Sequence, residues 1–443
     1  MINFQNICEE LITKKEKLAL VGLGYVGLPI AVEFAKYVQV IGFDIDQKRV
    51  DSYHDGIDVT QELCEELKKT TIEFTTDPLK LKEAKFIIVA VPTPVKENNE
   101  PDLTLLEDAS KIIGENLSIG TIVVFESTVY PGVTETICMP IIEQTSHLKC
   151  GIDWKIGYSP ERINPGDRIH TFSSICKIVS GMDIESATEI QKIYNIAVKA
   201  GTFLASSIKT AEAIKLIENS QRDVNIAFMN EIAKICNQLN VDTSEIVEGM
   251  NTKWNALGFQ PGMVGGHCIG VDSYYLLELA KNLKCDSSIL LQSRQMNESM
   301  ATYIADIAFR KLLKIKKDVK KITVLIWGIT FKENCSDIRN SKVIDLINRL
   351  KTYHIEPVIT DACANSKDVQ EAYGIKLVPF DDLPLADCII IAVAHSAYKS
   401  ITMEKLLKMF KDELPNNEKV LIDVKSLYNK DELCTSGICF WRL

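Results

Sequence analysis

KLALVGLGYVG, residues 17–27, is the segment from which the fold class of this chain follows. It begins with a mostly apolar run, typical of a buried strand, and continues in the pattern G-x-G-x-x-G, typical of a tight turn that opens a helix. Glycines in such a turn let the backbone approach a pyrophosphate, which the amino-terminus of the following helix binds favourably. The pattern predicts a dinucleotide site, whose turn residues are Gly22, Gly24, Tyr25, Val26 and Gly27.

An acidic residue after the next predicted strand indicates which dinucleotide binds. The strand is VQVIGFDID, residues 38–46, and its acid is Asp44. A carboxylate there can accept both ribose hydroxyls of the adenosine half and repels a 2′-phosphate, which favours NAD over NADP. Arg49, five residues further on, leaves the alternative open, because it could neutralise that phosphate or simply stack near the adenine. We expect NAD as the cofactor, with both residues at its adenosine end.

Further apolar runs extend this pattern into a parallel α/β sheet. AKFIIVAVPTP, residues 84–94, and TIVVFESTVYPG, residues 121–132, read as two more buried strands, each ending in a polar turn. In a doubly wound sheet, turns at the carboxyl ends of the strands line the ligand crevice.

The carboxyl-terminal part repeats the same order of patterns. KITVLIWGITFK at 321–332, IEPVITDAC at 355–363 and ADCIIIAVAHSAY at 386–398 follow the three amino-terminal strands in sequence. This weak internal repeat predicts a second doubly wound domain. Because it lacks the three-glycine pattern, we expect it to bind something other than a dinucleotide in the same manner.

A long helical pattern separates the two repeats. No glycine or proline occurs between Gly201 and Gly249, and apolar residues recur there at helical spacing, which predicts one long helix or two abutting ones. Such a helix is a plausible dimer surface, although a purely intrachain core helix remains the alternative. The predicted fold class is α/β, with two Rossmann-like domains, 1–205 and 316–443, joined by a central helical domain, 206–315.

Composition excludes several classes of protein. The 443 residues are 46% hydrophobic and 25% charged, as in ordinary globular proteins, and this length predicts two or three domains. A net charge of -10 opposes binding to nucleic-acid phosphates, so no nucleic-acid partner is expected.

We expect neither a secretory leader nor a membrane span in this sequence. The longest apolar run, residues 18–32, contains three glycines and Pro29 and stops at Glu33, short of the roughly 18 residues that a span requires. The 13 cysteines are scattered and odd in number, which favours reduced thiols. We therefore expect a cytoplasmic protein without membrane contact.

VGGHCIGVD, residues 264–272, contains the candidate nucleophile, Cys268. A metal site is disfavoured because no C-x-x-C or H-x-x-x-H partner lies nearby. A buried spacer fits poorly with the flanking glycines, which we expect to expose backbone, whereas a nucleophile needs open approach and N–H donors. Asp272 would oppose thiolate formation unless a cation such as Lys215 lay between them.

Lys215 and Asn219 are four residues apart in the long helical pattern and so share one face. A solvated helix face is the ordinary interpretation, and an oxyanion-stabilising pair is the alternative. A hydride acceptor and a cysteine nucleophile together point to one chemistry. An alcohol becomes an aldehyde, the thiolate adds to it, a second hydride leaves a thioester, and water releases a carboxylate.

Together these motifs resemble the UDP-glucose/GDP-mannose dehydrogenase family, the nucleotide-sugar 6-dehydrogenases. The likeness covers nearly the whole chain and rests on GLGYVGLP, VPTP, ESTVYPG, YSPERINPGD, AEAIKLIENSQRD, GGHCIGVD and FKENCSDIRN. YSPERINPGD, TKWN and GGHCIGVD resemble most the UDP-N-acetylhexosamine 6-dehydrogenases of Vi-polysaccharide and O-antigen type. The resemblance implies NAD-dependent oxidation of a UDP-N-acetylhexosamine at C6 by a homodimer joined through the central helix.

The resemblance also implies roles for individual residues. The catalytic residues it implies are Cys268 as nucleophile, Lys215 and Asn219 as oxyanion stabilisers, Asp272 and Thr128 as groups that hold water, and Glu161 as acid or base. Additional cofactor contacts are Thr93, Thr128 and Arg339, and substrate contacts are Glu161, Arg162, Lys215, Asn219, Lys253, Gly265 and Lys332. No metal is implied.

Three positions depart from the family pattern. Pro165 stands where many UDP-glucose dehydrogenases have a second glutamate, so a two-glutamate mechanism is not transferred. Ser273 replaces a usual proline, and Lys253 is the nearest cation to the place of an arginine that the family supplies from a neighbouring subunit. The sequence leaves open the C2 and C4 configuration of the sugar and the role of His267. The rival interpretations are a two-electron β-hydroxyacid-type dehydrogenase, a non-catalytic nucleotide-binding protein and a Cys/His metal protein.

Overall fold

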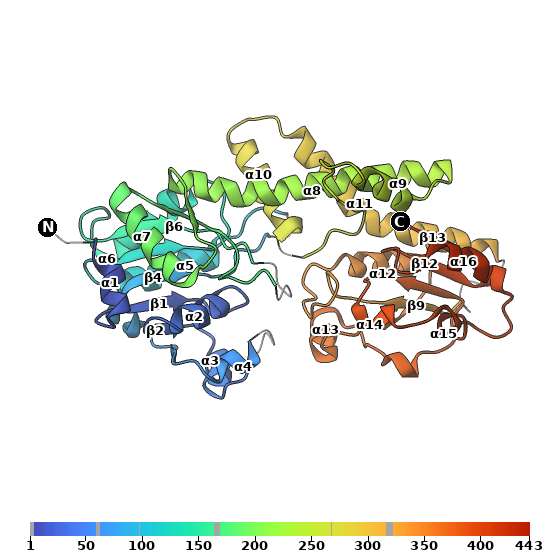
Figure 1. Cartoon of the computed structure of the whole chain (residues 1–443), viewed down its shortest axis with the longest axis horizontal. Coiled ribbons are helices and arrows are strands. Elements are labelled where there is room, and N and C mark those ends of the chain that lie inside the picture. The colour runs from blue at the N-terminus through green and yellow to red at the C-terminus, as the bar shows by residue number, and fades with distance from the viewer. Residues whose placement is uncertain (1–3, 59–62, 97, 164–168, 267, 316–321) are drawn as a thin grey trace. The chain divides into compact units, whose positions relative to one another are not determined.

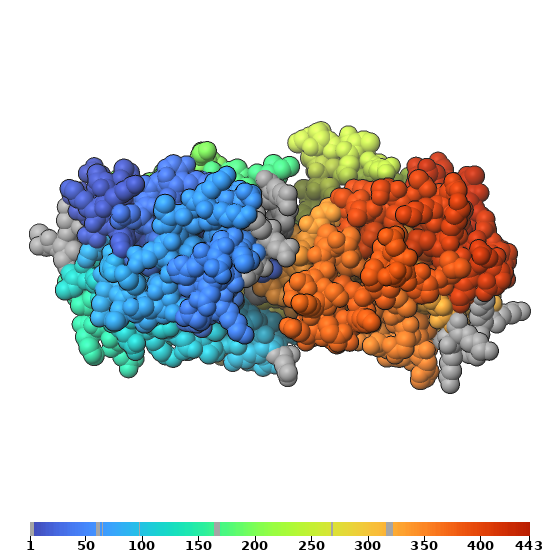
Figure 2. All heavy atoms as spheres, turned by 90° about the horizontal axis from the view of Figure 1, so that it is seen from below, coloured from blue at the N-terminus to red at the C-terminus, as the bar shows by residue number. Residues whose placement is uncertain are grey.

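The computed structural model describes the chain apart from residues 1–3, 59–62, 97, 164–168, 267 and 316–321, and of residues 64 and 268 it describes the backbone alone (Figure 1). The chain forms two compact units: residues 1–218 with 274–285, and residues 219–273 with 286–443. In the space-filling view, the blue to cyan residues belong to the first unit and the orange to red residues belong to the second (Figure 2).

The first unit contains an eight-stranded sheet. Its order is β3-β2-β1-β4-β5-β6-β7-β8, and the first six strands of the chain are parallel in the order 3-2-1-4-5-6 that typifies dinucleotide-binding domains. β7 then runs antiparallel to β6. The strands are β1 Lys17–Val21, β2 Val40–Phe43, β3 Glu73–Thr75, β4 Ala84–Val89, β5 Ile122–Phe125, β6 Lys155–Tyr158, β7 Lys177–Gly181 and β8 Thr202–Leu204.

Helices cover both faces of this sheet (Figure 1). They are α1 Ile7–Ile12, α2 Gly27–Ala35, α3 Gln47–His54, α4 Cys64–Leu67, α5 Thr104–Glu115, α6 Met139–Ser146 and α7 Ile184–Ala197, with a 3-10 turn η1 Pro78–Glu83 and a π turn η2 Thr134–Cys138. In β1, Leu18 and Leu20 pack into one core, and Ala19 and Val21 pack into the other. Burial on both faces explains why the parallel strands appear in the sequence as unbroken apolar runs.

The second unit contains a five-stranded parallel sheet of order β10-β9-β11-β12-β13, the 2-1-3-4-5 order of another doubly wound fold. Its strands are β9 Val324–Trp327, β10 Val358–Thr360, β11 Cys388–Ile391, β12 Val420–Asp423 and β13 Cys439–Arg442. Its helices are α9 Thr243–Asn251, α11 Ser288–Lys314, α12 Lys342–Thr352, α13 Ser366–Tyr373, α14 Ser396–Lys399, α15 Met403–Leu407 and α16 Lys430–Ser436, with 3-10 turns η4 Phe380–Asp382 and η5 Asn416–Glu418.

Two helices contain residues of both units. α8, Ile208–Leu239, is a single helix of 32 residues, which decides between one long helix and two abutting ones (Figure 1). α10, Cys268–Asn282, begins at the candidate nucleophile. The predicted fold class, two Rossmann-like sheets with a central long helix, is confirmed, while the three-part division of the chain stays a prediction.

The internal repeat is visible in backbone detail. Gly22 and Gly328 each follow the first strand of their sheet, and both have a φ of +92°. The next amide donates to an aspartate beyond the second strand: Leu23 N lies 2.8 Å from Asp44 Oδ2, and Ile329 N lies 2.6 Å from Asp361 Oδ2. The second unit lacks the rest of the dinucleotide turn, because Thr330 stands in the place of Gly24 and the next helix, α12, begins only at Lys342.

Among the described helices, none combines the length and the hydropathy that crossing a bilayer requires.

Candidate active site

The three glycines of the first turn differ in how much space a side chain would find at each position. A Cβ on Gly22 would lie 2.8 Å from the Ala90 carbonyl oxygen, and a Cβ on Gly27 would lie 1.8 Å from the carbonyl oxygen of Gly22. Both positions therefore exclude a side chain. A Cβ on Gly24, by contrast, would have no atom of another described residue within 4 Å, apart from its own neighbours along the chain. That side of the turn is open for the backbone to meet a pyrophosphate.

Asp44 is buried at the end of β2 and paired with Arg49. Its Oδ2 accepts from Leu23 N and lies 2.8 Å from Arg49 Nη1, while Oδ1 accepts from Asp46 N at 2.9 Å. Arg49 Nη2 also lies 3.8 Å from Asp46 Oδ2. Because two carboxylates already balance the Arg49 charge, a 2′-phosphate would have to compete with both of them. The arrangement fits NAD.

The two predicted threonines follow adjacent parallel strands. Thr93 is buried beyond the end of β4, and its carbonyl oxygen accepts from the Tyr275 hydroxyl at 2.9 Å. Thr128 is half-buried beyond the end of β5. Ser127 links the two turns, since its hydroxyl donates to Val91 O at 2.8 Å. Both threonines thus belong to the carboxyl edge of the sheet, as the sequence predicts.

Glu161 is held in a buried ionic network that the sequence patterns did not reveal. Its Oε2 lies 2.6 Å from Lys177 Nζ, and its Oε1 accepts from the amides of Arg162 and Ile163, each at 2.6 Å. Lys177 also lies 2.5 Å from Glu126 Oε2. A charged residue at the end of a buried strand needs a partner, so the lysine opening KIVSG and the glutamate after IVVF were the available signals.

The charges of this network balance one another. Burial would raise the pKa of Glu161, but Lys177 and the Ile163 amide hold that pKa below its ordinary value. Burial would lower the pKa of Lys177, and the two carboxylates raise it instead. Burial raises the pKa of Glu126 to about 7, against the attraction of Lys177. Glu161 is therefore a carboxylate at neutral pH, suited to orienting a water rather than to donating a proton.

Lys215 is anchored by the backbone of the same glutamate. Its ammonium donates to the carbonyl oxygen of Glu161. Arg162, the next residue, donates through Nε to Glu218 Oε2 at 3.1 Å and through Nη1 to Cys176 O at 3.0 Å. The structure thus brings Glu161, Arg162 and Lys215 together at one end of the long helix.

In the second unit, Asn219 and Asp272 form a buried pair. Asn219 Nδ2 donates to Asp272 Oδ2 at 2.6 Å, which joins α8 to the first turns of α10. Cys268 is the first residue of α10, four positions before Asp272. Its side chain, like the whole of His267 and Pro165, lies outside the described residues, so the expected proximity of Lys215 to the thiol stays a prediction.

Gly265 and Gly266 pack closely against the loop 331–340. A Cβ on Gly265 would lie 2.7 Å from Asn340 O, and a Cβ on Gly266, whose φ is +78°, would lie 2.5 Å from the Phe331 ring. The expectation that these glycines expose backbone is therefore wrong for this pair. They are needed because the loop carrying Phe331 approaches them directly.

The remaining three residues predicted to contact cofactor or substrate belong to the second unit. Lys332 is half-buried, with Nζ 5.4 Å from the centre of the Phe331 ring, and so lies beside the glycines. Arg339 is exposed on the same loop and pairs with Asp337 at 2.6 Å. Lys253 is exposed just beyond the end of α9.

Comparison with known proteins agrees with this arrangement. Residues 16–198 match the NAD binding domain of the UDP-glucose/GDP-mannose dehydrogenase family, residues 209–299 its central domain, and residues 325–430 its UDP binding domain. Protein CapL of Staphylococcus aureus is 46% identical over 427 residues, which is 96% of this chain and 99% of that protein.

Two further similar proteins are named for the reactions that they catalyse. A UDP-N-acetyl-D-glucosamine 6-dehydrogenase of Pseudomonas aeruginosa is 45% identical over 421 residues, 95% of this chain and 99% of that protein. The solved structure of a UDP-D-ManNAc dehydrogenase from Pyrococcus horikoshii superposes with a TM-score of 0.86 at 29% identity, covering 96% of this chain and 98% of that one. The resemblance drawn from the motifs is confirmed: the chain belongs to the UDP-glucose/GDP-mannose dehydrogenase family and is an NAD-dependent nucleotide-sugar oxidoreductase.

Proposed function

We propose that this enzyme oxidises the C6 hydroxymethyl of a UDP-N-acetylhexosamine, UDP-GlcNAc or UDP-GalNAc, to the uronate, as a step toward a surface polysaccharide. The 45% identity to the Pseudomonas aeruginosa UDP-N-acetyl-D-glucosamine 6-dehydrogenase supports the sugar class. The observation that carries the chemistry is the start of α10, where Cys268 is the first helical residue and the Asn219–Asp272 pair follows one turn later.

The side chains have separate tasks in this reaction. NAD, held by the dinucleotide turn and Asp44, would supply the hydride acceptor for both oxidations. Cys268 adds to the C6 aldehyde to form a thiohemiacetal, which becomes a thioester on loss of the second hydride. Lys215 and Asn219, four residues apart on α8, stabilise the oxyanion. Asp272, Thr128 and Glu161 orient the water that releases the carboxylate and the thiol. In total, one alcohol, one water and two NAD give one carboxylate, two NADH and three protons.

Cofactor and substrate contacts complete the proposal. Gly22, Gly24, Tyr25, Val26, Gly27, Asp44, Arg49, Thr93, Thr128 and Arg339 hold NAD, and Glu161, Arg162, Lys215, Asn219, Lys253, Gly265 and Lys332 hold the UDP-sugar. We assign NAD binding to residues 1–205, the catalytic helices to 206–315 and UDP binding to 316–443. A cytoplasmic location is supported by the described cysteines, all of which are free thiols.

We further propose that the enzyme is a homodimer joined through α8. Ile217, Phe228, Ile235 and Leu239 are exposed on this helix, at spacings that place them on one face. Exposed apolar residues gathered on one side of a helix are typical of a protein interface. Lys253, next to Trp254, which is 91% exposed, belongs to a stretch that a partner subunit can cover.

The decisive experiment counts electrons for each sugar. The purified enzyme, given NAD and a panel of UDP-sugars, should turn over UDP-GlcNAc or UDP-GalNAc and yield two NADH per uronate. UDP-N-acetylmannosamine or UDP-glucose as the preferred substrate would redirect the sugar assignment. One NADH per sugar would instead identify a two-electron dehydrogenase and refute the proposal.

A variant of the nucleophile tests the thioester step. Cys268→Ser should stall after the first oxidation or trap a sugar ester on the enzyme, visible by mass spectrometry, with NAD binding near normal. Release of free uronate at the wild-type rate by this variant would remove Cys268 from the mechanism.

A further inference from the structure

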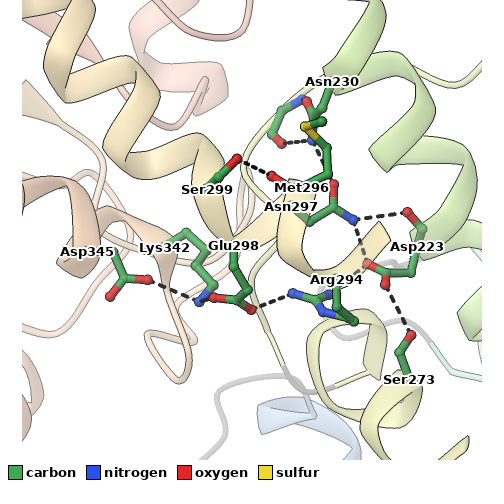
Figure 3. A network of polar contacts seen from close by, with 11 residues as sticks. Asp223, Asn230, Ser273, Arg294, Met296, Asn297, Glu298, Ser299, Lys342 and Asp345 are labelled. Carbon is green, nitrogen blue, oxygen red and sulfur yellow. Dashed lines mark hydrogen bonds and ion pairs between the residues drawn. The ribbon is translucent and has the colours of Figure 1, made fainter. Parts of the chain in front are cut away.

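A polar network contacts Gly262 and Ser273, the two ends of the segment that carries the candidate nucleophile, residues 262–273 (Figure 3). Four of its members, Asp223, Asn230, Arg294 and Asn297, are each at most 1% exposed and form what we call the clamp. Asp223 and Asn230 belong to α8, and Arg294 and Asn297 belong to α11. The proposed mechanism uses none of the four.

The carboxyl end of the segment is attached to Asp223. Ser273, which directly follows Asp272, donates its hydroxyl to Asp223 Oδ2 at 3.2 Å (Figure 3). Asn219 and Asp223 are one helical turn apart on α8, so the bonds that hold Asp272 and Ser273 come from the same face of that helix. Together they determine the position and rotation of the start of α10 on α8.

The amino end of the segment is attached to Asn230. The side chain of Asn230 makes a two-way contact with Gly262: Nδ2 donates to Gly262 O at 3.0 Å, and Oδ1 accepts from Gly262 N at 2.8 Å. A paired donor and acceptor hold a backbone peptide in both position and orientation. Gly262 lies three residues before Gly265, so this contact sets where the glycine-rich turn begins.

Asn297 connects the two ends. Its Nδ2 donates to Asp223 Oδ1 at 2.7 Å and to Asp223 O at 3.0 Å, while its Oδ1 accepts from Asn230 Nδ2 at 2.8 Å. Arg294 Nη1 lies 2.7 Å from Asp223 Oδ1 and supplies the charge that a buried carboxylate requires. Both attachments of the segment therefore belong to one hydrogen-bonded unit.

The clamp also reaches the loop that borders the glycines. Arg294 pairs with Glu298, which pairs with Lys342 at the first position of α12 (Figure 3). α12 follows the loop 331–340, whose Phe331 and Asn340 approach Gly266 and Gly265. The network consequently fixes the segment at both ends and fixes the surface against which its middle packs.

We propose that Asp223, Asn230, Arg294 and Asn297 are positioning residues that hold both ends of the segment 262–273 and thereby aim Cys268 and Asp272 at the reacting carbon. This inference rests on the proposed function. Positioning of this kind matters most after the aldehyde forms, because a misplacement of about 1 Å costs roughly 100-fold in rate when a nucleophile must meet its carbon.

The test loosens one end of the segment at a time. Ser273→Ala removes the bond to Asp223, and Asn230→Ser removes the two bonds to Gly262 together with the bond to Asn297. Each should lower kcat by about threefold or more, since the net contribution of a single hydrogen bond is about 0.5–1.5 kcal/mol, while the KM for NAD stays unchanged. Ser299→Ala is the matched control, because within the described part of the chain this α11 hydroxyl bonds to Lys234 Nζ at 2.8 Å and to Met296 O rather than to the clamp.

The readout that separates positioning from mere stability is the reactivity of the thiol. The rate of Cys268 labelling by iodoacetamide is measured by mass spectrometry over a range of pH. In Ser273→Ala and Asn230→Ser this rate should fall, or its pH profile should shift. In Ser299→Ala both should match wild type. Unchanged kcat and labelling in both variants would overturn the inference, as would equal losses of melting temperature in all three with unchanged labelling. Failure of Cys268→Ser to block uronate release would refute the proposed function instead, so the two failures are distinguishable.

Discussion

Among the single residues, those of the dinucleotide turn show that one motif can contain two kinds of glycine. Gly22 and Gly27 are required by the protein itself, since a methyl group at either would meet a backbone carbonyl oxygen. A methyl group on Gly24 would meet nothing of the described protein, so we attribute this glycine to the proposed contact with NAD. The motif therefore contains two glycines that the fold requires and one that we attribute to ligand binding.

This difference predicts opposite phenotypes for two alanine variants. Gly24→Ala should leave the melting temperature within about 2 °C of wild type and weaken NAD binding by about tenfold or more, equivalent to about 1.4 kcal/mol. Gly27→Ala should lower the melting temperature strongly, because its Cβ would lie 1.8 Å from Gly22 O. Thermal unfolding and NAD titration measure both effects. Normal NAD affinity in Gly24→Ala would contradict the role assigned to the open side of the turn.

Among the secondary-structure elements, the antiparallel strand β7 brings a cation to the carboxyl edge of a parallel sheet. Because β7 runs opposite to β6, its first residue, Lys177, lies beside the end of β6 and reaches Glu161 and Glu126. Tyr194, from α7, donates its hydroxyl to Glu126. Elements distant in the sequence thus contribute to one buried network of ion pairs and hydrogen bonds. The same network holds Glu161, whose backbone carbonyl accepts from Lys215.

The network predicts a pH dependence of stability that Glu126→Gln removes. The pKa of Glu126 is about 7 in the folded protein and about 4.5 ordinarily, so its contribution is fully present below about pH 4.5 and is lost as pH rises through 7. The wild-type free energy of unfolding should therefore lose a few kcal/mol between about pH 5 and pH 7 from this group.

Urea unfolding across that range measures the effect, and Glu126→Gln should show a flatter profile. Glu161 does not interfere, because its pKa is lowered and its contribution is lost only as pH falls through that lowered value, in the acid range. Parallel profiles for wild type and variant would show that Glu126 keeps an ordinary pKa.

In the molecule as a whole, α8 carries three groups of residues to which we assign different roles. It carries Lys215 and Asn219, to which we assign the oxyanion, Asp223 and Asn230 of the proposed clamp, and a row of exposed apolar residues on another part of its surface. A helix of this length in one chain is stabilised by packing on several sides. An exposed apolar row is what we expect a second copy of the chain to cover.

Phe228→Glu tests that expectation. A charge in the middle of the row should weaken dimerisation by about 30-fold or more, since a central interface residue contributes about 2 kcal/mol or more. Sedimentation velocity over a range of concentrations measures the change. Ile184→Glu is the control, because Ile184 is an exposed apolar residue on α7 and outside the row. An unchanged oligomer in Phe228→Glu would exclude α8 as the interface.

Local sequence patterns were sufficient to identify the two Rossmann-like repeats, the long central helix, the dinucleotide turn and the family. These features depend on apolar periodicity, on glycine spacing and on neighbours within a few residues, and such patterns are legible in one chain. The candidate nucleophile and the Lys215–Asn219 spacing were found in the same way.

Which polar groups meet, by contrast, depended on the folded chain. Lys177 and Glu126 are 51 positions apart, and Asn297 and Asp223 are 74 apart, so no local pattern pairs them. The packing of Gly266 against Phe331 was likewise invisible, and the sequence alone favoured the opposite interpretation. Buried charges and amides must be satisfied by some partner, but only the folded backbone brings that partner within hydrogen-bonding distance, because the partner comes from a different element of the chain.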